Sequence, residues 1–315
     1  MSPISRLVVV GGNGFIGSAV CKSALAHGLQ VTSVSSSGRP YQTPKGHTPA
    51  WTAKVDWQTG DALRPETFAR HLDGATGVVH TLGILLEDAG YKRAVRDGDV
   101  PALLRAFFAD RNPLSPPATT YETMNRDAAL RVCEAFLESA PPAEASSLVR
   151  PFVFISAADV FRPWISARYI ETKRAAERGI AQLFAADPDR FRGVYLRPGL
   201  VYHAHQRPLT TPAAALLDLT STVHAALPDT LRVSLRAAVQ QLPGRVSEQT
   251  PSPVVSVANA LSTAPMHVDH VGSAAVAACV NAEIRGVLEV KQMREAIGWR
   301  PDSSAGRTPV SVQGL

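Results

Sequence analysis

The stretch Val8-Val9-Val10-Gly11-Gly12-Asn13-Gly14-Phe15-Ile16-Gly17 decides the fold of this 315-residue chain. Its three valines predict a buried strand, and apolar residues continue at helical spacing from Ile16 to Leu25. The glycines between them predict a tight turn with backbone N–H groups at the positive end of a helix, where a pyrophosphate binds. This order favours a dinucleotide site over a merely structural turn. We expect the following residues of the turn to contact the cofactor: Gly11, Asn13, Gly14, Phe15, Ile16 and Gly17.

Composition narrows the class of protein. The hydrophobic fraction of 45% provides a sizeable core for one large domain or two closely packed ones. The net charge is +5, but Lys and Arg form no dense block, so nucleic-acid binding is not indicated and an anionic cofactor or membrane surface suits the charge. Three isolated cysteines predict neither a disulfide nor a metal site. No apolar run predicts a transmembrane span, and a first strand beginning by about Arg6 leaves no room for a cleavable targeting peptide.

The end of the second predicted strand, residues 29–34, bears on the choice of cofactor. Sites that prefer NAD usually carry a carboxylate about 20 positions past the glycines, which accepts from the ribose 2′-OH. Here Ser35 is followed by two more serines, a glycine and Arg39, with no carboxylate nearby. Hydroxyls and a guanidinium suit a 2′-phosphate, so the sequence favours NADP, with NAD as the alternative. Arg39 lies beyond the strand end, and a solvated loop arginine is an equal interpretation.

Two further strands and an insertion follow. Residues 55–62 predict a strand ending beside the adenine, with Asp61 and Ala62 as contacts, although Asp61 is equally placed to cap a helix starting near Pro65. Residues 77–83 predict a buried strand in which His80 is a core residue. Its end is expected along the ribose and phosphates of the cofactor and comprises Thr81, Leu82 and Gly83. The irregular residues 84–118 predict a lid or a partner surface.

The candidate catalytic residues lie in the second half of the nucleotide-binding region. Residues 152–156 predict a buried strand with Ser156 at its carboxyl end, where ligands bind in this fold. A predicted helix over 167–184 places Tyr169 and Lys173 one turn apart on one face. Lys173 would bond the nicotinamide ribose and lower the phenol pKa, so that Tyr169 exchanges a proton with a substrate oxygen polarised by Ser156. Asn125 is expected on a helix beneath this site, from about residue 121 to 137.

Past the sixth strand, residues 193–197, the alternation of strands and helices weakens. Pro198, Gly199 and Val201 complete the expected cofactor contacts, which also include Tyr169 and Lys173. Amphipathic helices within 213–242 predict either an apolar cleft or an ordinary packed cap, and Asp269 is expected to cap a later helix. We therefore predict an α/β fold, a Rossmann-type doubly wound parallel sheet over residues 1–203. A small, mostly helical substrate-side portion over 204–300 and a disordered tail over 301–315 follow it.

Four motifs together resemble the extended or atypical short-chain dehydrogenases/reductases over most of residues 5–300. They are the glycine turn, Gly60-Asp61, Tyr169-x-x-x-Lys173 and Arg197-Pro198-Gly199. Within that family, four stretches are similar to the fungal mitochondrial member associated with coenzyme Q biosynthesis. These stretches are residues 80–87 with Tyr91-Lys92, 121–125, 154–157 and 169–177.

This resemblance implies an oxidoreductase that supports ubiquinone biosynthesis. It implies a quinone-type or prenylated ring as substrate, other coenzyme Q biosynthesis proteins as partners in a multiprotein complex, and a peripheral place on the matrix side of the mitochondrial inner membrane. One departure concerns the serine: alignment on Val160-Phe161 puts the family's catalytic position at Ala157, which leaves Ser156 one residue early and on the opposite face. Two alternatives therefore stay open. One is a non-catalytic cofactor-binding subunit, as in respiratory complex I, and the other is a sugar-nucleotide epimerase or dehydratase.

Overall fold

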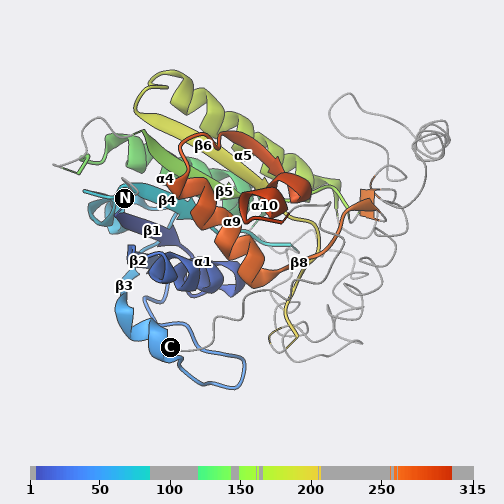
Figure 1. Ribbon diagram of the computed structural model, residues 1–315. Helices are drawn as coiled ribbons and strands as arrows, with labels where there is room; N and C mark the ends of the chain where they lie inside the picture. The colour runs from blue at the N-terminus through green and yellow to red at the C-terminus, as the bar shows by residue number, and fades with distance from the viewer. Residues whose placement is uncertain are drawn as a thin grey trace, which may run out of the picture.

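A seven-stranded parallel sheet forms the centre of the protein (Figure 1). The computed structural model describes residues 5–85, 120–142, 149–160, 162, 166–204, 206, 256, 259–260 and 262–299. The strand order is β3-β2-β1-β4-β5-β6-β9. Successive strands are therefore added toward one edge of the sheet as far as β3 and toward the opposite edge from β4 onward, with the reversal between β1 and β4. The strands are β1 (Arg6–Val10), β2 (Gln30–Ser35), β3 (Val55–Thr59), β4 (Gly77–His80), β5 (Arg150–Ile155), β6 (Phe191–Arg197) and β9 (Gly286–Glu289). The predicted doubly wound fold is confirmed, and the reversal marks the edge where such sheets bind ligands.

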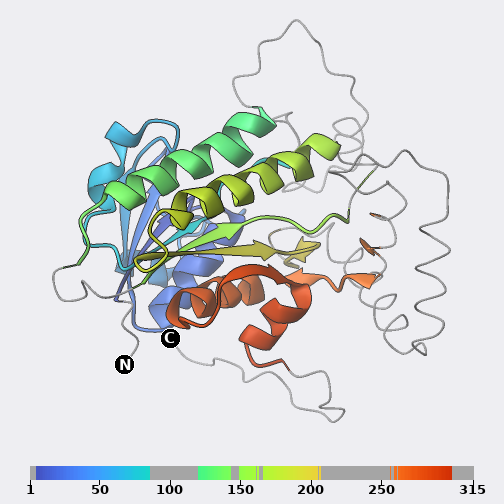
Figure 2. The same cartoon turned by 90° about the horizontal axis from the view of Figure 1, so that it is seen from above.

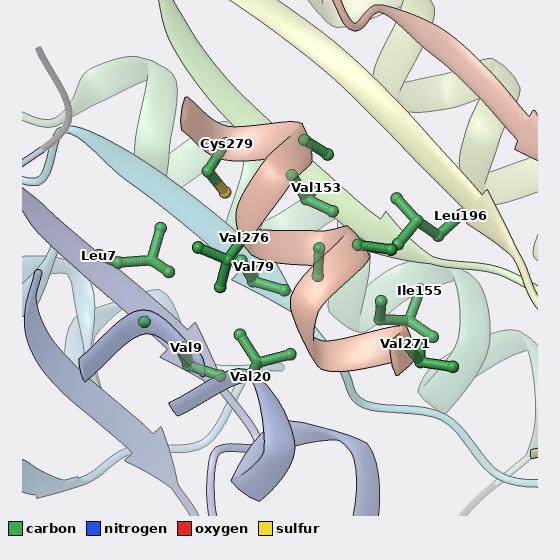
Figure 3. Close-up of a cluster of buried hydrophobic side chains, with 14 of the residues drawn as sticks. Leu7, Val9, Val20, Val79, Val153, Ile155, Leu196, Val271, Val276 and Cys279 are labelled. Carbon is green, nitrogen blue, oxygen red and sulfur yellow. The ribbon is translucent and has the colours of Figure 1, made fainter. Parts of the chain in front are cut away.

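Helices cover both faces of the sheet (Figure 2). One face carries α1 (Phe15–Ala26), α9 (Val268–Val280) and α10 (Val290–Ala296), and the other carries α4 (Ala128–Glu138) and α5 (Ala167–Ala185). Alternate residues of each strand therefore enter different cores. Val9, Val79 and Val153 pack against α1 and α9 (Figure 3), whereas Val8 and Val78 belong to the cluster under α4 and α5.

Gly272 explains how closely α1 and α9 pack. A Cβ atom at this position would lie 2.6 Å from the backbone carbonyl carbon of Ala19, so only glycine allows the two helices to meet. Ser23 and Ser273 approach to 3.5 Å along the same contact. Because α9 packs here and β9 pairs with β6, part of the expected substrate-side portion 204–300 lies in the layers of the main sheet.

Three local details differ from the sequence expectations. The single helix expected near Pro65 is two short 3₁₀ turns, η2 (Pro65–Thr67) and η3 (Ala69–His71). The helix expected from Tyr121 begins as a π-helix, η4 (Glu122–Asp127), before α4. Asp269 was wrongly expected to cap α9, because the ring of His267 takes that role by accepting from the Asp269 N–H at 3.3 Å.

The remaining described elements are short. A 3₁₀ turn, η1 (Ala50–Lys54), precedes β3, and β7 (Val201–Tyr202) pairs in parallel with β8 (Met266–His267). Within the residues that the structure covers, none of the helices combines the length and apolar character that a membrane crossing requires. Most of the predicted insertion, the helices of 213–242 and the tail 301–315 lie outside the described residues.

Candidate cofactor and active site

The glycine turn joins β1 to α1 in the geometry that an anion-binding turn requires. Gly11 has φ 88°, and its N–H donates to the Val34 carbonyl at 2.8 Å. A Cβ on Gly17 would lie 2.1 Å from the Gly11 carbonyl oxygen, so any larger residue would break the turn. Gly14 is the N-cap of α1, which has no side-chain cap and no acidic residue in its first turn. The positive end of its dipole is therefore left for an anion, and Phe15 and Ile16 lie half-buried beside it.

The loop after β2 lies against this turn. Asn13 Nδ2 donates to the Ser37 hydroxyl at 3.0 Å, and the hydroxyl of Ser35 accepts from the Gly38 N–H at 3.2 Å. Arg39 is exposed, and no ion pair joins its guanidinium to another described residue. The structure thus brings together the glycine turn and the residues expected to meet a 2′-phosphate.

Asp61 and Ala62 follow β3 at the expected place, but the Asp61 carboxylate is engaged within its own turn. It accepts from the Leu63 N–H at 3.0 Å and pairs with Arg64 at 2.9 Å. The Leu63 N–H, with Arg64, holds the pKa of this carboxyl below its usual range. Asp61 therefore has the turn-capping contacts of the second interpretation, and Ala62 packs into the core.

Lys173, on α5, contacts the segment that follows β4. Its Nζ donates to the Ile155 carbonyl at 2.9 Å and to the Leu82 carbonyl at 3.3 Å. A Cβ on Gly83 would lie 2.7 Å from Nζ and 2.9 Å from the Asn125 Oδ1, so a larger residue there would displace these two side chains. Thr81 anchors the same segment by donating to the Val10 carbonyl at 2.8 Å. Lys173 is only 3% exposed, and burial lowers its pKa to about 7.

Asn125 and Tyr121 fix the chain just beyond this segment. The buried Asn125 amide accepts from the Ile84 N–H at 2.9 Å and donates to the Ile84 carbonyl at 3.2 Å. The Tyr121 hydroxyl donates to the Leu85 carbonyl at 2.9 Å. Asn125 lies in the π-helix, a feature frequent at functional sites. The sequence showed only a polar residue among apolar helical positions and did not predict the bonds to Ile84.

Tyr169 lies half-buried near the start of α5, one helical turn before Lys173. Its ring meets the edge of Tyr121 at a centroid distance of 6.0 Å. An ion pair between Arg168 and Glu122, at 2.7 Å, ties the start of α5 to the π-helix. The candidate proton donor is thus positioned by both helices on this face.

Ser156 has contacts other than those expected. In the alternation along β5 it follows Phe154 and so faces α5. Its hydroxyl donates to the Glu177 carboxylate and accepts from Arg174 at 3.0 Å, and the residue is 3% exposed. Its described contacts are therefore with a buried ionic cluster and not with Tyr169 or Lys173.

His80 is a core residue, as the sequence indicated. It is fully buried between Phe152 and Phe154, and burial lowers its pKa to about 3, so the ring is neutral. Neither ring nitrogen has a hydrogen-bond partner among the described residues.

The expected contacts after β6 lie at the same edge of the sheet. The Pro198 carbonyl accepts from the Ala158 N–H at 2.8 Å. A Cβ on Gly199 would be 3.0 Å from the Thr263 side chain, and Val201 enters the small sheet with Met266. Chain segments from both halves of the sequence therefore converge beside the candidate site.

Comparison with known proteins agrees with this geometry. Residues 7–95 match the NAD dependent epimerase/dehydratase family. The chain is 35% identical over 212 residues to "MIOREX complex component 2" of Saccharomyces cerevisiae, covering 64% of this chain and 75% of the yeast protein. It is 28% identical over 293 residues to an uncharacterized chloroplastic protein of Arabidopsis thaliana, covering 92% and 77% of the two chains.

Solved structures share the fold. The UDP-glucuronic acid 4-epimerase of Bacillus cereus, in complex with NAD, superposes with a TM-score of 0.51 at 17% identity, over 90% of this chain and 76% of the epimerase. The glycine turn, the parallel sheet and the match to the yeast protein lead to one family assignment. The chain belongs to the NAD dependent epimerase/dehydratase family of the short-chain dehydrogenases/reductases.

Proposed function

We propose that this protein binds NADP(H) and acts as an oxidoreductase through Tyr169 and Lys173. The observation that carries the proposal is the position of Lys173, whose buried Nζ lies against Leu82 and Gly83 while Tyr169 lies one turn earlier on α5. Family membership supports a nicotinamide dinucleotide as the cofactor. The site fits the cofactor because glycines leave room for its close approach and the start of α1 carries no protein carboxylate.

The loop after β2 supports NADP over NAD. Ser35 closes β2 without an adjacent carboxylate, and the exposed Arg39 follows a bend that Asn13 ties to the glycine turn. A guanidinium binds a phosphate group by charge-assisted hydrogen bonds. Asp61 lies at the end of the neighbouring strand, but its carboxylate is already engaged by Leu63 and Arg64.

The proposed chemistry divides between two side chains. When bound, the nicotinamide accepts or supplies a hydride. With a nicotinamide dinucleotide bound, Lys173 would donate its remaining hydrogen bond to the ribose, since two of its donors already bond Ile155 and Leu82. With a pKa near neutrality it can also take up and release a proton. Tyr169 exchanges a proton with the substrate oxygen. Because the Ser156 hydroxyl is engaged by Glu177 and Arg174, proton transfer depends on Tyr169 without that serine.

We further propose a role in mitochondrial ubiquinone biosynthesis, with a quinone-type or prenylated ring as substrate. The similarity of residues 80–87, 121–125, 154–157 and 169–177 to the coenzyme Q-associated member supports this role and a peripheral place on the matrix side of the inner membrane. The name of the yeast relative, a component of a complex, supports membership of a multiprotein assembly. The second candidate function is a non-catalytic cofactor-binding subunit, which the engagement of Ser156 favours.

Titration with NADPH and NADH, followed by nucleotide fluorescence, tests the cofactor assignment. We expect NADPH to bind more tightly, and Arg39→Gln to weaken NADPH binding about tenfold while leaving NADH binding unchanged. Arg131→Gln, which removes an exposed arginine from α4, is the matched control. Preference for NADH would overturn the NADP assignment, and failure to bind either nucleotide would overturn the proposed function.

The proposed pathway needs a cellular test. A Saccharomyces cerevisiae strain lacking the relative would be complemented with this chain, with ubiquinone content and respiratory growth as readouts. We expect both to recover. Recovery of growth without a change in ubiquinone content would assign the protein to another mitochondrial process.

A further inference from the structure

Three side chains of α5 hold three consecutive residues at the carboxyl end of β5. Lys173 donates to the Ile155 carbonyl at 2.9 Å, and Arg174 donates to the Ala157 carbonyl at 2.8 Å. Between them, the Glu177 carboxylate accepts from the Ser156 hydroxyl. The position of Lys173 is therefore coupled to the other contacts that α5 makes with this strand end.

Glu177 is the centre of this arrangement. It is 6% exposed and pairs with Arg174 at 2.7 Å. Arg197, the last residue of β6, donates to it through Nε at 3.0 Å and again through Nη2. Arg197 also pairs at 3.0 Å with Glu289, the last residue of β9. The ionic cluster thus crosses the carboxyl ends of β5, β6 and β9.

The carboxylate of Glu177 stays ionised in spite of its burial. Burial raises its pKa, but the hydrogen bond from Arg197 and the charge of Arg174 outweigh burial and hold the pKa below its usual value. A buried ion pair contributes little net stability, yet removal of one partner is strongly destabilising because it leaves uncompensated charge. The better-supported use of such a cluster is to specify one arrangement of the elements that it joins.

We propose that Glu177 is a positioning residue, which fastens α5 to the ends of β5 and β6 and so sets where Lys173 meets Leu82 and Gly83. The proposal rests on the proposed cofactor function, since that function gives the position of Lys173 its purpose. It also assigns the Ser156 hydroxyl to the same cluster, where it satisfies one lone pair of the carboxylate.

The charges that face Lys173 make the proposal testable by pH. On α5 these are Glu177 and Arg174, and from β4 His80 faces it as a neutral ring. Arg197 and Glu289 lie behind Glu177. Replacing Glu177 by glutamine removes a carboxylate and leaves both arginines in place, so Lys173 will lose its proton at lower pH.

The experiment compares Glu177→Gln with Glu138→Gln, which removes an exposed carboxylate from the end of α4. NADPH affinity is measured by fluorescence from mildly acidic to alkaline pH. We expect Glu177→Gln to weaken binding about tenfold and to move the pH midpoint of binding downward, and Glu138→Gln to change neither. Glu177→Asp keeps the negative charge on a shorter side chain. Its pH midpoint of binding should therefore lie close to the wild-type value, while its NADPH affinity should remain reduced.

A second measurement needs no cofactor. The pH at which the unfolding free energy of the cofactor-free protein begins to rise reports the pKa of Lys173. We expect Glu177→Gln to lower that pH, and Glu177→Asp, which keeps the charge, to leave it near the wild-type value. If the glutamine variant does not fold, the loss of NADPH affinity in Glu177→Asp carries the test. Wild-type affinity and pH profiles in both measurements would overturn the proposal. Failure of the wild-type protein to bind NADPH would overturn the cofactor function alone, since the unfolding measurement still decides the role of Glu177.

Discussion

Asn125 holds Ile84 by both backbone polar groups, with Oδ1 accepting from the N–H at 2.9 Å and Nδ2 donating to the carbonyl at 3.2 Å. The amide is fully buried in a π-helix, and Ile84 follows directly on the Leu82-Gly83 segment that Lys173 contacts. The π-helix therefore fixes the path of the chain at the edge where the cofactor is proposed to lie.

Asn125→Leu should destabilise the protein and weaken NADPH binding. Leucine has a similar volume but leaves the Ile84 N–H and carbonyl unpaired, at about 1 to 3 kcal/mol each. Urea unfolding should show a loss of about 2 to 6 kcal/mol. Asn281→Leu, at an exposed residue after α9, is the control and should cost less than about 1 kcal/mol. An equal, small effect of both changes would mean that Asn125 does not hold this segment.

Two glycine substitutions distinguish a steric clash within the glycine turn from the conformational cost of a positive φ. Gly17→Ala places a Cβ against the backbone oxygen of Gly11, which cannot move without opening the turn. We expect loss of nucleotide binding and a marked fall in melting temperature. Gly28→Ala is the matched control, because its φ of 74° costs about 1 kcal/mol but nothing lies within 4 Å. It should bind nucleotide normally.

The pH dependence of the unfolding free energy should show the titration of the buried Lys173. Its pKa is about 7 in the folded protein, below the usual 10.5, so between these values the unfolded chain binds more protons. Its contribution to the unfolding free energy therefore rises with pH from about 7 to about 10.5 and is flat below that window. In Lys173→Met this rise should vanish, whereas Lys54→Met, at an exposed lysine, should keep it. Urea unfolding at several pH values compares them, and parallel curves for all three proteins would contradict the burial of a titrating Lys173.

The strand, turn and helix around Gly11 were predictable because the local pattern and the required contacts coincide there. Gly11 and Gly17 are only six positions apart and pack directly against each other, so the spacing of the glycines is enough to predict the turn. Strands β1, β4 and β5 were predictable for a similar reason, since they are buried on both faces and read as short, mostly apolar runs.

The site itself depends on contacts between distant residues, which spacing does not report. The bonds from Asn125 to Ile84 join positions 41 residues apart, and those from Arg197 to Glu177 join positions 20 apart. Ser156 could be placed at a strand end but not oriented, because its partner is chosen by the packing of α5. Asp269 illustrates the same limit on a smaller scale: the ring of His267, two residues earlier, takes the cap that a carboxylate usually provides.

Ser156→Ala and Tyr169→Phe should have different effects if Tyr169 transfers the proton. Ser156 contacts Glu177 and Arg174, so its replacement removes one bond from a carboxylate that two arginines still hold, and hydride transfer should change less than about tenfold. Tyr169→Phe keeps the ring contact with Tyr121 and should leave NADPH affinity nearly intact. Turnover should fall at least about a hundredfold, as for the loss of a general acid. The same variants in the complementation assay decide between the two candidate functions. If Tyr169→Phe, with full nucleotide occupancy, restores ubiquinone content as well as the wild-type chain does, the protein acts as a cofactor-binding subunit and not as an enzyme.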